Sequence, residues 1–278
     1  MKLGCNTVLF NQLDLYGALQ HISWAGYDGA ELAFLGNMAQ HVQLNVDESY
    51  IDEVKATARK HNLELFAIEA SFGAGVARPD TAPEEEKIKV AVRLFEVANK
   101  LGIPVIAIGS GGKAGDREAT EKVFDFLRKV SEEAESWDIT LAVKPHVGAS
   151  LWNTETVLQL LSKVDSPALG INFDPSHLYR AGDDLVKAAL KIGDRIVHSH
   201  FRDCPHRQRH PGLPEQQIPG RGEIDIPATL RALKEVGYDG VLDLEVIGAF
   251  TYPLSRQMGI AAEARGYLNR CLQELKIE

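Results

Sequence analysis

Short apolar runs alternate with longer amphipathic stretches along the whole of this 278-residue chain. Several of the runs are continuously apolar, which is typical of strands that are covered on both faces, as in a parallel sheet. Successive runs begin 26 to 45 residues apart, which leaves room for one strand and one helix each time. The predicted strands are Leu3–Val8, Gly29–Phe34, Leu63–Ala70, Val105–Ile108, Thr140–Val143, Ala168–Phe173, Ile196–Phe201 and Val241–Val246.

The amphipathic stretches between these runs predict helices. In Glu84–Leu101, apolar residues recur at helical spacing, the first turn is rich in Glu, and Gly102 follows the last turn. Further helices are predicted over Arg117–Trp137, Glu155–Val164 and Ile226–Val236, and over a stretch that ends at Ile192. Asn153 or Thr154 can cap the helix Glu155–Val164, and Asp183 or Asp184 can cap the helix that ends at Ile192.

Eight strand–helix repeats without a Pro/Gly/Ser-rich linker favour one α/β architecture. A (β/α)8 TIM barrel uses eight parallel strands, each followed by a helix, in about 250 residues. A doubly wound open sheet is the alternative, and it would need fewer strands or a second domain. The sequence therefore predicts a single barrel domain over residues 1–278.

Composition narrows the class of protein. The chain has 45% hydrophobic and 25% charged residues, a mixture typical of folded globular domains. Its net charge of −9 disfavours a nucleic-acid groove, which needs a basic footprint. No apolar run has the length of a membrane span, and the first residues lack a secretory apolar region, so we expect a cytoplasmic protein. Cys5, Cys204 and Cys271 form no metal or redox motif. A homo-oligomer is possible.

Ionisable residues concentrate where the last four predicted strands end. In a TIM barrel the reacting groups lie at the carboxyl ends of the strands and in the loops that follow. Because side chains alternate along a strand, residues two apart share a face, and several ionisable groups should converge at one mouth. Burying them without partners or a metal ion would be costly. They are Lys144, His146, Asp174, His177, His198, His200, Arg202, Asp203, Asp243 and Glu245.

Three of these residues form a candidate metal site. Asp174, His200 and Glu245 offer two carboxylates and an imidazole from neighbouring strands, which suits Mn²⁺, Mg²⁺, Zn²⁺ or Co²⁺. Each has a structural alternative. Asp174 can cap a helix, His200 can be a hydrogen-bonded core histidine, and Glu245 can pair with Lys144.

Several motifs carry a resemblance to a known family. They are GYDGAEL at 26–32, DPSH at 174–177, HFRD at 200–203 and GRGEIDIPATLRALKEVGYDGVLDLE at 220–245. The chain resembles the sugar-phosphate isomerase/epimerase family, that is, the xylose isomerase-like TIM barrels, which include endonuclease IV, keto-sugar 3-epimerases and inosose dehydratase. The resemblance covers nearly the whole chain. It implies a barrel fold and a divalent metal, whereas endonuclease IV's additional histidine ligands are missing at the third and fourth strand ends.

The family's first metal ligand is replaced in this chain. The resemblance implies ligands at Asp174, His200 and Glu245, with His177 next to them, but Lys144 stands where the family has a strand-five Glu. A protonated lysine cannot ligate a metal. Three outcomes are open: a metal on the remaining ligands, a Lys144 ammonium that replaces the metal and stabilises an enediolate oxygen, or a Lys144 of lowered pKa that acts as a base or forms a Schiff base. A structural ion pair with Asp243 or Glu245 is the alternative.

Other residues are candidates for substrate contacts. His146 and Arg202 lie at the predicted mouth, Glu69 can reach a sugar hydroxyl or pair inside the barrel as Glu31 can, and Trp152 can stack on a sugar ring. The long loop 203–222 carries several Arg and His residues and is a candidate lid or anion clamp, or a surface loop. The Gly-rich segment 109–114 is predicted to be a loop, since the Rossmann and Walker patterns both fail.

These observations predict a carbohydrate isomerase or epimerase that removes a proton next to a carbonyl, with Glu245, Lys144 and His177 as the catalytic residues. The expected partner is a small carbohydrate, and neither a nucleic acid nor a membrane. Two alternatives stay open. A sugar lyase or dehydratase would begin with the same proton abstraction, and a non-catalytic carbohydrate-binding subunit would have lost its metal site at Lys144.

Overall fold

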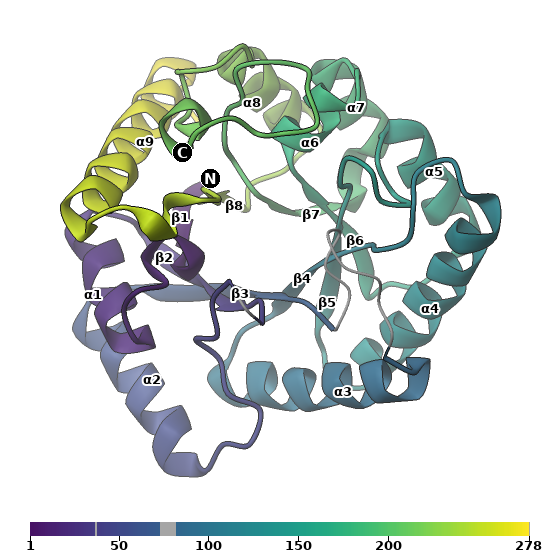
Figure 1. Cartoon of the computed structure of the whole chain (residues 1–278), viewed down its shortest axis with the longest axis horizontal. Coiled ribbons are helices and arrows are strands. Elements are labelled where there is room, and N and C mark those ends of the chain that lie inside the picture. The colour runs from purple at the N-terminus through teal and green to yellow at the C-terminus, as the bar shows by residue number, and fades with distance from the viewer. Residues whose placement is uncertain (37, 73–81, 278) are drawn as a thin grey trace.

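Eight parallel strands form a barrel that a ring of helices surrounds, in a computed structural model that describes residues 1–36, 38–72 and 82–277 (Figure 1). The strands are β1 (Lys2–Asn6), β2 (Gly29–Phe34), β3 (Glu64–Ala70), β4 (Val105–Gly109), β5 (Thr140–Lys144), β6 (Leu169–Phe173), β7 (Ile196–Ser199) and β8 (Val241–Leu244). Buried polar side chains lie inside the barrel and at the carboxyl ends of its strands, where the site described below is found.

The strand order establishes the barrel. Neighbours follow the order β7-β6-β5-β4-β3-β2-β1-β8, and β1 pairs with β8 from Lys2 opposite Val241 to Cys5 opposite Leu244. The remaining seam, between β7 and β8, is bridged by His200 and Asp243. The predicted TIM barrel is therefore confirmed, and the alternative of a doubly wound open sheet is wrong.

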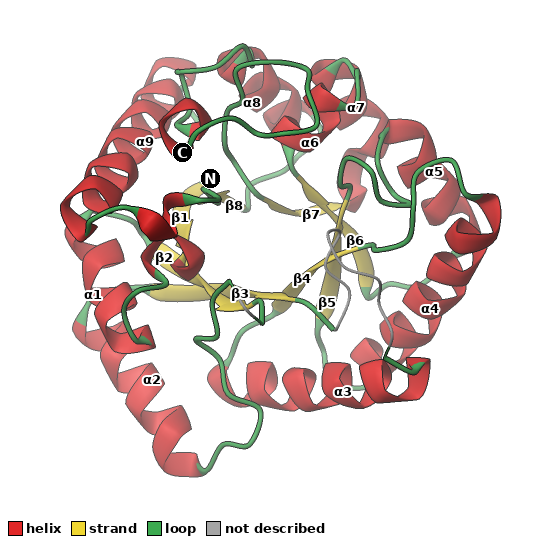
Figure 2. Cartoon of the chain, viewed as in Figure 1, coloured by secondary structure: helices red, strands yellow, loops and turns green. Residues whose placement is uncertain are grey.

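The helices lie outside the strands (Figure 2). Those between strands are α1 (Leu15–Trp24), α2 (Glu48–Lys60), α3 (Glu84–Leu101), α4 (Arg117–Glu135), α5 (Thr154–Lys163), α6 (Pro175–Arg180), α7 (Leu185–Ile192) and α8 (Ile226–Glu235), and α9 (Leu254–Leu275) follows the last strand. Short 3₁₀ turns are η1 (Thr7–Phe10), η2 (Gly193–Arg195), η3 (Pro214–Gln217) and η4 (Ala249–Thr251). Among the described helices, no segment is long and apolar enough to cross a membrane.

Side-chain caps fix where several helices begin. Asn153 accepts a hydrogen bond from the Thr156 amide at the start of α5, and Asp184 accepts one from the Lys187 amide at the start of α7. Each cap satisfies an amide that the helix itself leaves unpaired. Of the alternative caps that the sequence left open, Asn153 and Asp184 are therefore the ones used.

Three predicted strands extend too far at their carboxyl ends. The first ends at Asn6, because the Asn6 side chain caps the 3₁₀ turn η1 by accepting a hydrogen bond from the Val8 amide. The last two end at Ser199 and Leu244, and only the isolated bridge between His200 and Asp243 continues the pairing. The polar residues that follow these strands therefore lie in loops at the mouth.

Two glycines allow a side chain of the neighbouring strand to approach the backbone closely. A Cβ at Gly4 would lie 2.7 Å from Oδ2 of Asp243, and one at Gly170 would lie 2.4 Å from a methyl carbon of Val197. Glycine is therefore required at both positions by the close approach of a neighbouring side chain.

Asp203 closes the long loop after β7. Its carboxylate accepts hydrogen bonds from the amides of Cys204 (2.8 Å), Gly220 (2.9 Å) and Ile224 (3.1 Å), so it joins the two ends of the loop. We expect Asp203→Ala to lower the free energy of unfolding by about 2–3 kcal/mol, since the amides of the buried residues Cys204 and Ile224 lose their acceptor. Urea denaturation measures the change. The exposed Asp239→Ala is the control, and equal stability of the two variants would contradict this function of Asp203.

Candidate active site at the barrel mouth

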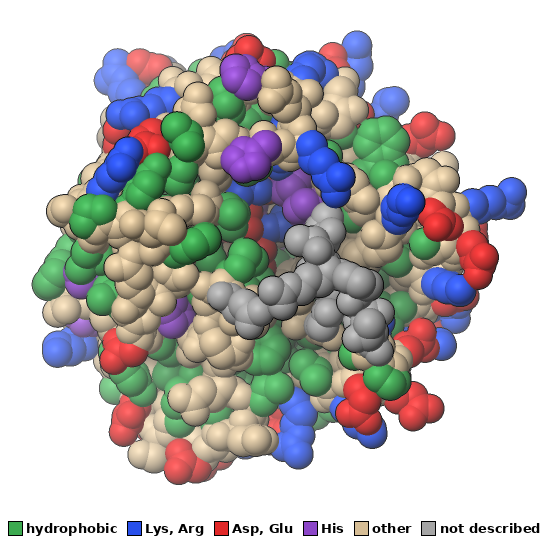
Figure 3. Space-filling model, in the orientation of Figure 1, with side chains coloured by type: hydrophobic (Ala, Val, Ile, Leu, Met, Phe, Trp, Pro, Cys, Tyr) green, Lys and Arg blue, Asp and Glu red, His purple; other side chains and the backbone are tan. Residues whose placement is uncertain are grey.

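Four buried ionisable side chains from separate strands meet at the carboxyl end of the barrel. Glu69 is in β3, Lys144 ends β5, and His200 and Glu245 follow β7 and β8. We call these four residues the Lys144 cluster. In Figure 3 the centre of the molecule is hollowed, and basic and histidine side chains are visible at the bottom of the hollow. The convergence predicted from the strand ends is thus present in the structure.

Lys144 lies at the centre of this group. Its Nζ atom is 2.6 Å from Oε1 of Glu69, 2.8 Å from Oε1 of Glu245 and 3.1 Å from Nδ1 of His200. The predicted ion pair with Glu245 is present, and Glu69 is a second carboxylate partner. The ammonium group can use one N–H for each of the three neighbours.

The two carboxylates that bind Lys144 differ in their pKa. Burial and the charge of Glu245 raise the pKa of Glu69 to about 7, although Lys144 opposes this shift. Burial also acts to raise the pKa of Glu245, but Arg202 and Lys144 outweigh burial and hold that pKa well below its usual range. Burial alone would lower the pKa of Lys144, whereas Glu245 and Glu69 raise it above its ordinary value. Lys144 and Glu245 are therefore both charged at neutral pH.

Arg202 is a second buried cation beside this cluster. Its Nη2 atom lies 2.8 Å from Nε2 of His177, 3.3 Å from Oε2 of Glu245 and 3.5 Å from Oδ2 of Asp174. Its Nε atom donates to Oγ of Ser176 at 2.9 Å. Glu245 consequently has a cation on each side, with Lys144 at one oxygen and Arg202 at the other.

Asp174 is a helix cap with one oxygen left over. Its Oδ1 atom accepts from the amide of Ser176 (2.9 Å), from its hydroxyl (2.6 Å) and from the amide of His177 (3.3 Å). This is the structural alternative that an Asp-Pro sequence suggests. Its Oδ2 atom is buried and accepts no hydrogen bond from the described residues, so it is free to accept one from a ligand.

Two neutral histidines line the same side of the mouth. The rings of His146 and His177 lie 3.9 Å apart between centroids. Burial and the charge of Lys144 lower the pKa of His146 to about 4, and burial together with His146 and Arg202 holds the pKa of His177 well below its usual range. His146 is only half-buried, so it is the more accessible of the two.

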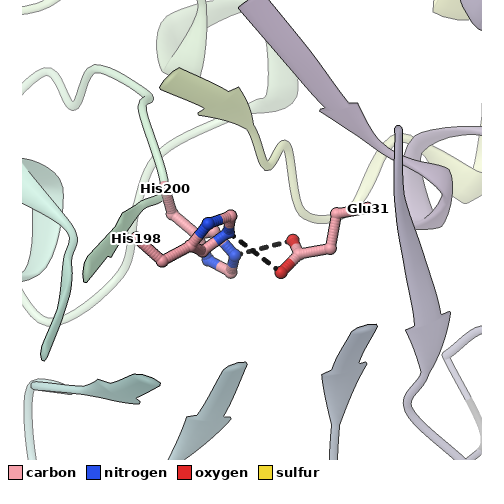
Figure 4. A group of neighbouring side chains, drawn as sticks. All are labelled: Glu31, His198 and His200. Atoms are coloured by element: carbon pink, nitrogen blue, oxygen red, sulfur yellow. Dashed lines mark hydrogen bonds and ion pairs between the residues drawn. The ribbon is translucent and has the colours of Figure 1, made fainter. Parts of the chain in front are cut away.

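A second group lies deeper in the barrel. The Glu31 carboxylate of β2 lies 2.7 Å from Nε2 of His200 and 3.2 Å from Nε2 of His198. The three side chains point toward one another across the interior (Figure 4). Asn6 links the two levels, because its Nδ2 atom donates to Glu31 at 2.6 Å and to Glu69 at 2.8 Å. We call Glu31, His198 and His200 the floor group.

Two groups of side chains have donors suited to a divalent metal. In each group the donor atoms lie within 4.8 Å of one another: Glu69, His200 and Glu245 at the mouth, and the floor group below. At the mouth the position between the three donors is taken by Nζ of Lys144. A divalent ion and a protonated Lys144 cannot share those donors, so the mouth as it stands does not fit a metal ion.

The other residues predicted for the site, Asp174 and Trp152, share no hydrogen bond or ion pair with Lys144 in the described structure. Asp174 is joined to Glu245 through Arg202, whereas His200 lies 3.5 Å from Glu245. Trp152 is half-buried in the loop before α5, where its amide bonds to the Thr156 hydroxyl.

The arginines of loop 203–222 each contact a different residue. Arg207 stacks on Tyr179 at 4.2 Å, and Arg221 pairs with Glu263 on the outside of the barrel. Arg209 accepts a hydrogen bond from Arg180 through its backbone carbonyl. Each of these contacts is structural and none reaches the Lys144 cluster.

Sequence reasoning missed two residues of the site. The sequence analysis places Asn6 in a strand and gives it no function. Its position at the carboxyl end of the first strand, where site residues of a barrel are found, is the feature that points to it. Arg180, which lies 3.0 Å from Nδ1 of His177, is in the helix after β6 and had no signal beyond its spacing of three residues from His177.

Comparison with known proteins agrees with this architecture. An inosose dehydratase of Lacticaseibacillus casei is 23% identical over 255 residues, covering 82% of this chain and 80% of the relative. A solved D-tagatose 3-epimerase-like protein superposes with a TM-score of 0.80 at 20% identity, covering 99% and 98% of the two chains. A solved IOLI protein, described with a bound zinc atom, gives 0.77 at 20% identity, covering 95% and 96%.

A family model also matches most of the chain. It is described as the xylose isomerase-like TIM barrel, and it matches residues 19–271. That range contains the four residues of the Lys144 cluster and the whole floor group. The chain therefore belongs to the xylose isomerase-like TIM barrel family.

Proposed function

We propose that this protein is a carbohydrate-modifying enzyme that removes a proton next to the carbonyl of a keto-sugar or a cyclic polyol ketone. The observation that carries the proposal is the Lys144 ammonium, held between Glu69 and Glu245 at the mouth of the barrel. A buried cation between two carboxylates is a costly arrangement for stability alone. It is well suited to a reaction in which negative charge develops on an oxygen and a proton moves nearby.

Lys144 takes the electrophilic function in this proposal. The ammonium and the Arg202 guanidinium both border Glu245, so an enolate oxygen placed beside them would be stabilised by two fixed charges. The relative with a bound zinc atom is similar to this chain in fold. In this chain the cation between Glu69 and Glu245 is the Lys144 ammonium, which is part of the protein itself.

The two carboxylates divide the proton transfers between them. Glu245 is held ionised by Arg202 and Lys144, and its Oε2 atom accepts no hydrogen bond from the described residues, so it is the proton acceptor. Glu69, whose pKa burial raises to about 7, is the proton donor. Carboxylates whose environments separate their pKa values in this way are the pattern of acid–base pairs in enzymes.

The neutral residues and Arg202 position the substrate. His177 lies against the Arg202 guanidinium, with Nε2 2.8 Å from Nη2, and His146 is the more exposed of the two histidines. We propose that His146 and Asp174 bind substrate hydroxyls, the latter through its free Oδ2 atom. Trp152 stays a proposed substrate contact at the rim.

Solvent isotope exchange tests the proposal. The enzyme is incubated in D2O with ketohexoses, their phosphates and inososes, and the products are followed by NMR. Deuterium on the carbon next to the carbonyl, with an isomeric product, supports an isomerase or epimerase. Absence of exchange for every compound, together with saturable sugar binding, would identify a binding protein and overturn the enzymatic proposal.

A dehydratase is the second candidate, and the donor carboxylate favours it. β-Elimination needs a base for the proton and an acid for the departing hydroxyl, which are the functions assigned to Glu245 and Glu69. An inosose dehydratase is among the relatives of this chain. In the same NMR experiment, a dehydratase shows loss of a hydroxyl and formation of an unsaturated or deoxy ketone.

The proton donor predicts a pH dependence. Since Glu69 must be protonated to act as an acid, we expect kcat/KM to fall about tenfold per pH unit above about pH 7, where the pKa of Glu69 lies. In Glu69→Gln this alkaline fall should disappear, along with most of the activity. A wild-type profile that rises through pH 7 would contradict the assignment of Glu69 as the donor.

A further inference from the structure

Each turnover of the proposed reaction leaves the two carboxylates of the mouth in the wrong protonation states. Glu245 begins ionised and gains the proton that it removes from the substrate, whereas Glu69 begins protonated and loses its proton. The next substrate needs Glu245 ionised and Glu69 protonated again. Between turnovers, a proton must therefore pass from Glu245 to Glu69, or each carboxylate must exchange its proton with the solvent.

Both carboxylates are shielded from the solvent. The side chains of Glu69 and Glu245 are only 6% and 4% exposed. Oε2 of Glu69 accepts a hydrogen bond from Asn6 at 2.8 Å, so Oε1 is the oxygen that faces Lys144. Oε2 of Glu245 lies beside Arg202, whose guanidinium stays protonated in proteins and cannot relay a proton. These surroundings favour a path inside the protein over exchange with water.

Lys144 bridges the two carboxylates. Its Nζ atom lies 2.6 Å from Oε1 of Glu69 and 2.8 Å from Oε1 of Glu245, and among the described residues it is the group that hydrogen-bonds to both. Heavy atoms at these distances are within reach for proton transfer. A lysine amine, unlike a guanidinium, can give up a proton and regain it.

A third contact fixes the position of this nitrogen. Nδ1 of His200 lies 3.1 Å from Nζ of Lys144, and Nε2 of the same ring lies 2.7 Å from Oε2 of Glu31. The imidazole is thus held between Glu31 and Lys144 and cannot turn away. Rotation about the Cε–Nζ bond then presents the nitrogen to each carboxylate in turn, while Nζ itself stays in place.

We propose that Lys144 returns the proton from Glu245 to Glu69 after each turnover, an inference that rests on the proposed function. The ammonium gives a proton from Nζ to Oε1 of Glu69 and becomes an amine. The carboxyl group of Glu245 turns its protonated oxygen toward Nζ, and the amine takes that proton. Lys144 is then an ammonium again, Glu245 is ionised, Glu69 is protonated, and no proton has entered or left the site.

The environments of the two carboxylates give this transfer its direction. Arg202 and Lys144 outweigh burial and hold the pKa of Glu245 well below its usual range, whereas burial and the charge of Glu245 raise the pKa of Glu69 to about 7. Burial lowers the pKa of Lys144 and the two carboxylates raise it. Once Glu245 is protonated, one of these two charges is gone, so the ammonium gives up its proton more readily.

Lys144→Arg tests the proton return. Arginine keeps a positive charge between the carboxylates but is not deprotonated in proteins, so only the return of the proton is lost. The compound that the wild type converts is mixed with each protein, and the product is measured by rapid chemical quench. We expect from Lys144→Arg a product burst equal to the enzyme concentration, followed by turnover about 100-fold slower than that of the wild type. Lys187→Arg, which changes an exposed lysine, should behave as the wild type.

A small buffer distinguishes a lost proton path from a distorted site. Imidazole should raise the slow steady-state rate of Lys144→Arg in proportion to its concentration, because it exchanges protons with the carboxylates, and it should leave the wild-type rate unchanged. Steady-state turnover of Lys144→Arg at the wild-type rate, without a burst, would overturn the inference alone. Absence of turnover by the wild type with every compound would overturn the proposed function, and the inference with it.

A second variant gives an answer if the larger guanidinium distorts the mouth. Lys144→Ala leaves space that a small cation from solution can fill. Millimolar ethylamine should restore turnover, because its ammonium can give and regain a proton, whereas guanidinium, which has the same charge, should not. Equal restoration by the two cations would show that a fixed charge is sufficient, and the proton return by Lys144 would be refuted.

Discussion

Lys144→Met is expected to lower the free energy of unfolding by about 3–5 kcal/mol. The substitution keeps most of the side-chain volume but leaves Glu69 and Glu245 buried without the ammonium that lies 2.6 and 2.8 Å from them. Removal of one partner from a buried ion pair costs about this much, because an uncompensated charge stays in the interior. Urea denaturation at neutral pH measures the loss.

Two further variants test the cause of that loss. Lys187→Met changes an exposed lysine that pairs with Asp184, and such surface pairs contribute about 0–1 kcal/mol. Adding Glu245→Gln to Lys144→Met should recover part of the stability, since a neutral amide needs no cation. If Lys144→Met is as stable as Lys187→Met, the ammonium does not hold the two carboxylates together.

Lys144→Met should also make the mouth accessible to metal. With the ammonium removed, Glu69, His200 and Glu245 present donors that are already close enough for one ion. Addition of Mn²⁺ or Zn²⁺ should then raise the melting temperature of the variant more than that of the wild type, because an ion that binds only the folded state stabilises it. This would show that the lysine occupies the place of a metal.

Glu245→Gln is expected to lower kcat by about 10²–10⁴-fold, which is the usual contribution of a general base. Gln keeps the shape of the side chain but cannot accept the substrate proton, and it removes the negative charge between Lys144 and Arg202. Deuterium incorporation into recovered substrate, measured alongside kcat, reports the proton-abstraction step itself. Both rates should fall together.

A surface glutamate provides the matched control. Glu263 pairs with Arg221 on the outside of the barrel, and Glu263→Gln should leave both rates unchanged. If Glu245→Gln loses turnover but still exchanges deuterium at the wild-type rate, Glu245 acts after proton abstraction and the base is another residue. Glu69 would then be the next residue to examine.

The barrel was predictable because its signal is local and repeated. Apolar runs mark each strand, and capping residues such as Asn153 and Asp184 mark the helix starts. The helices α1, α2, α6 and α9 had no prediction of their own. The buried face of α2 contains only Ile51, Val54 and Ala58, so its apolar stripe is weak. The first strand ends earlier than predicted because the Asn6 side chain accepts a hydrogen bond from the turn that follows it, an interaction that hydrophobic periodicity does not encode.

The site was predictable in composition but not in pairing. Lys144, His200 and Glu245 were expected at one mouth because all follow strand ends. Glu69, the second partner of Lys144, is 75 residues away in the sequence, and a strand-three carboxylate can equally face a different neighbour. The sequence predicts which ionisable residues converge at the mouth. The distances between them, which determine whether a metal ion or the Lys144 ammonium lies among the donors, depend on how the barrel closes.

That closure imposes an order on folding. Strand β1 has β8 as one of its two neighbours, and β8 begins at Val241, far later in the sequence. One edge of β1 therefore stays unpaired until β8 has been synthesised, and open strand edges are where other chains can add. Contacts between the two ends of a sequence also slow folding. The barrel, and with it the Lys144 cluster, is completed by the final strand.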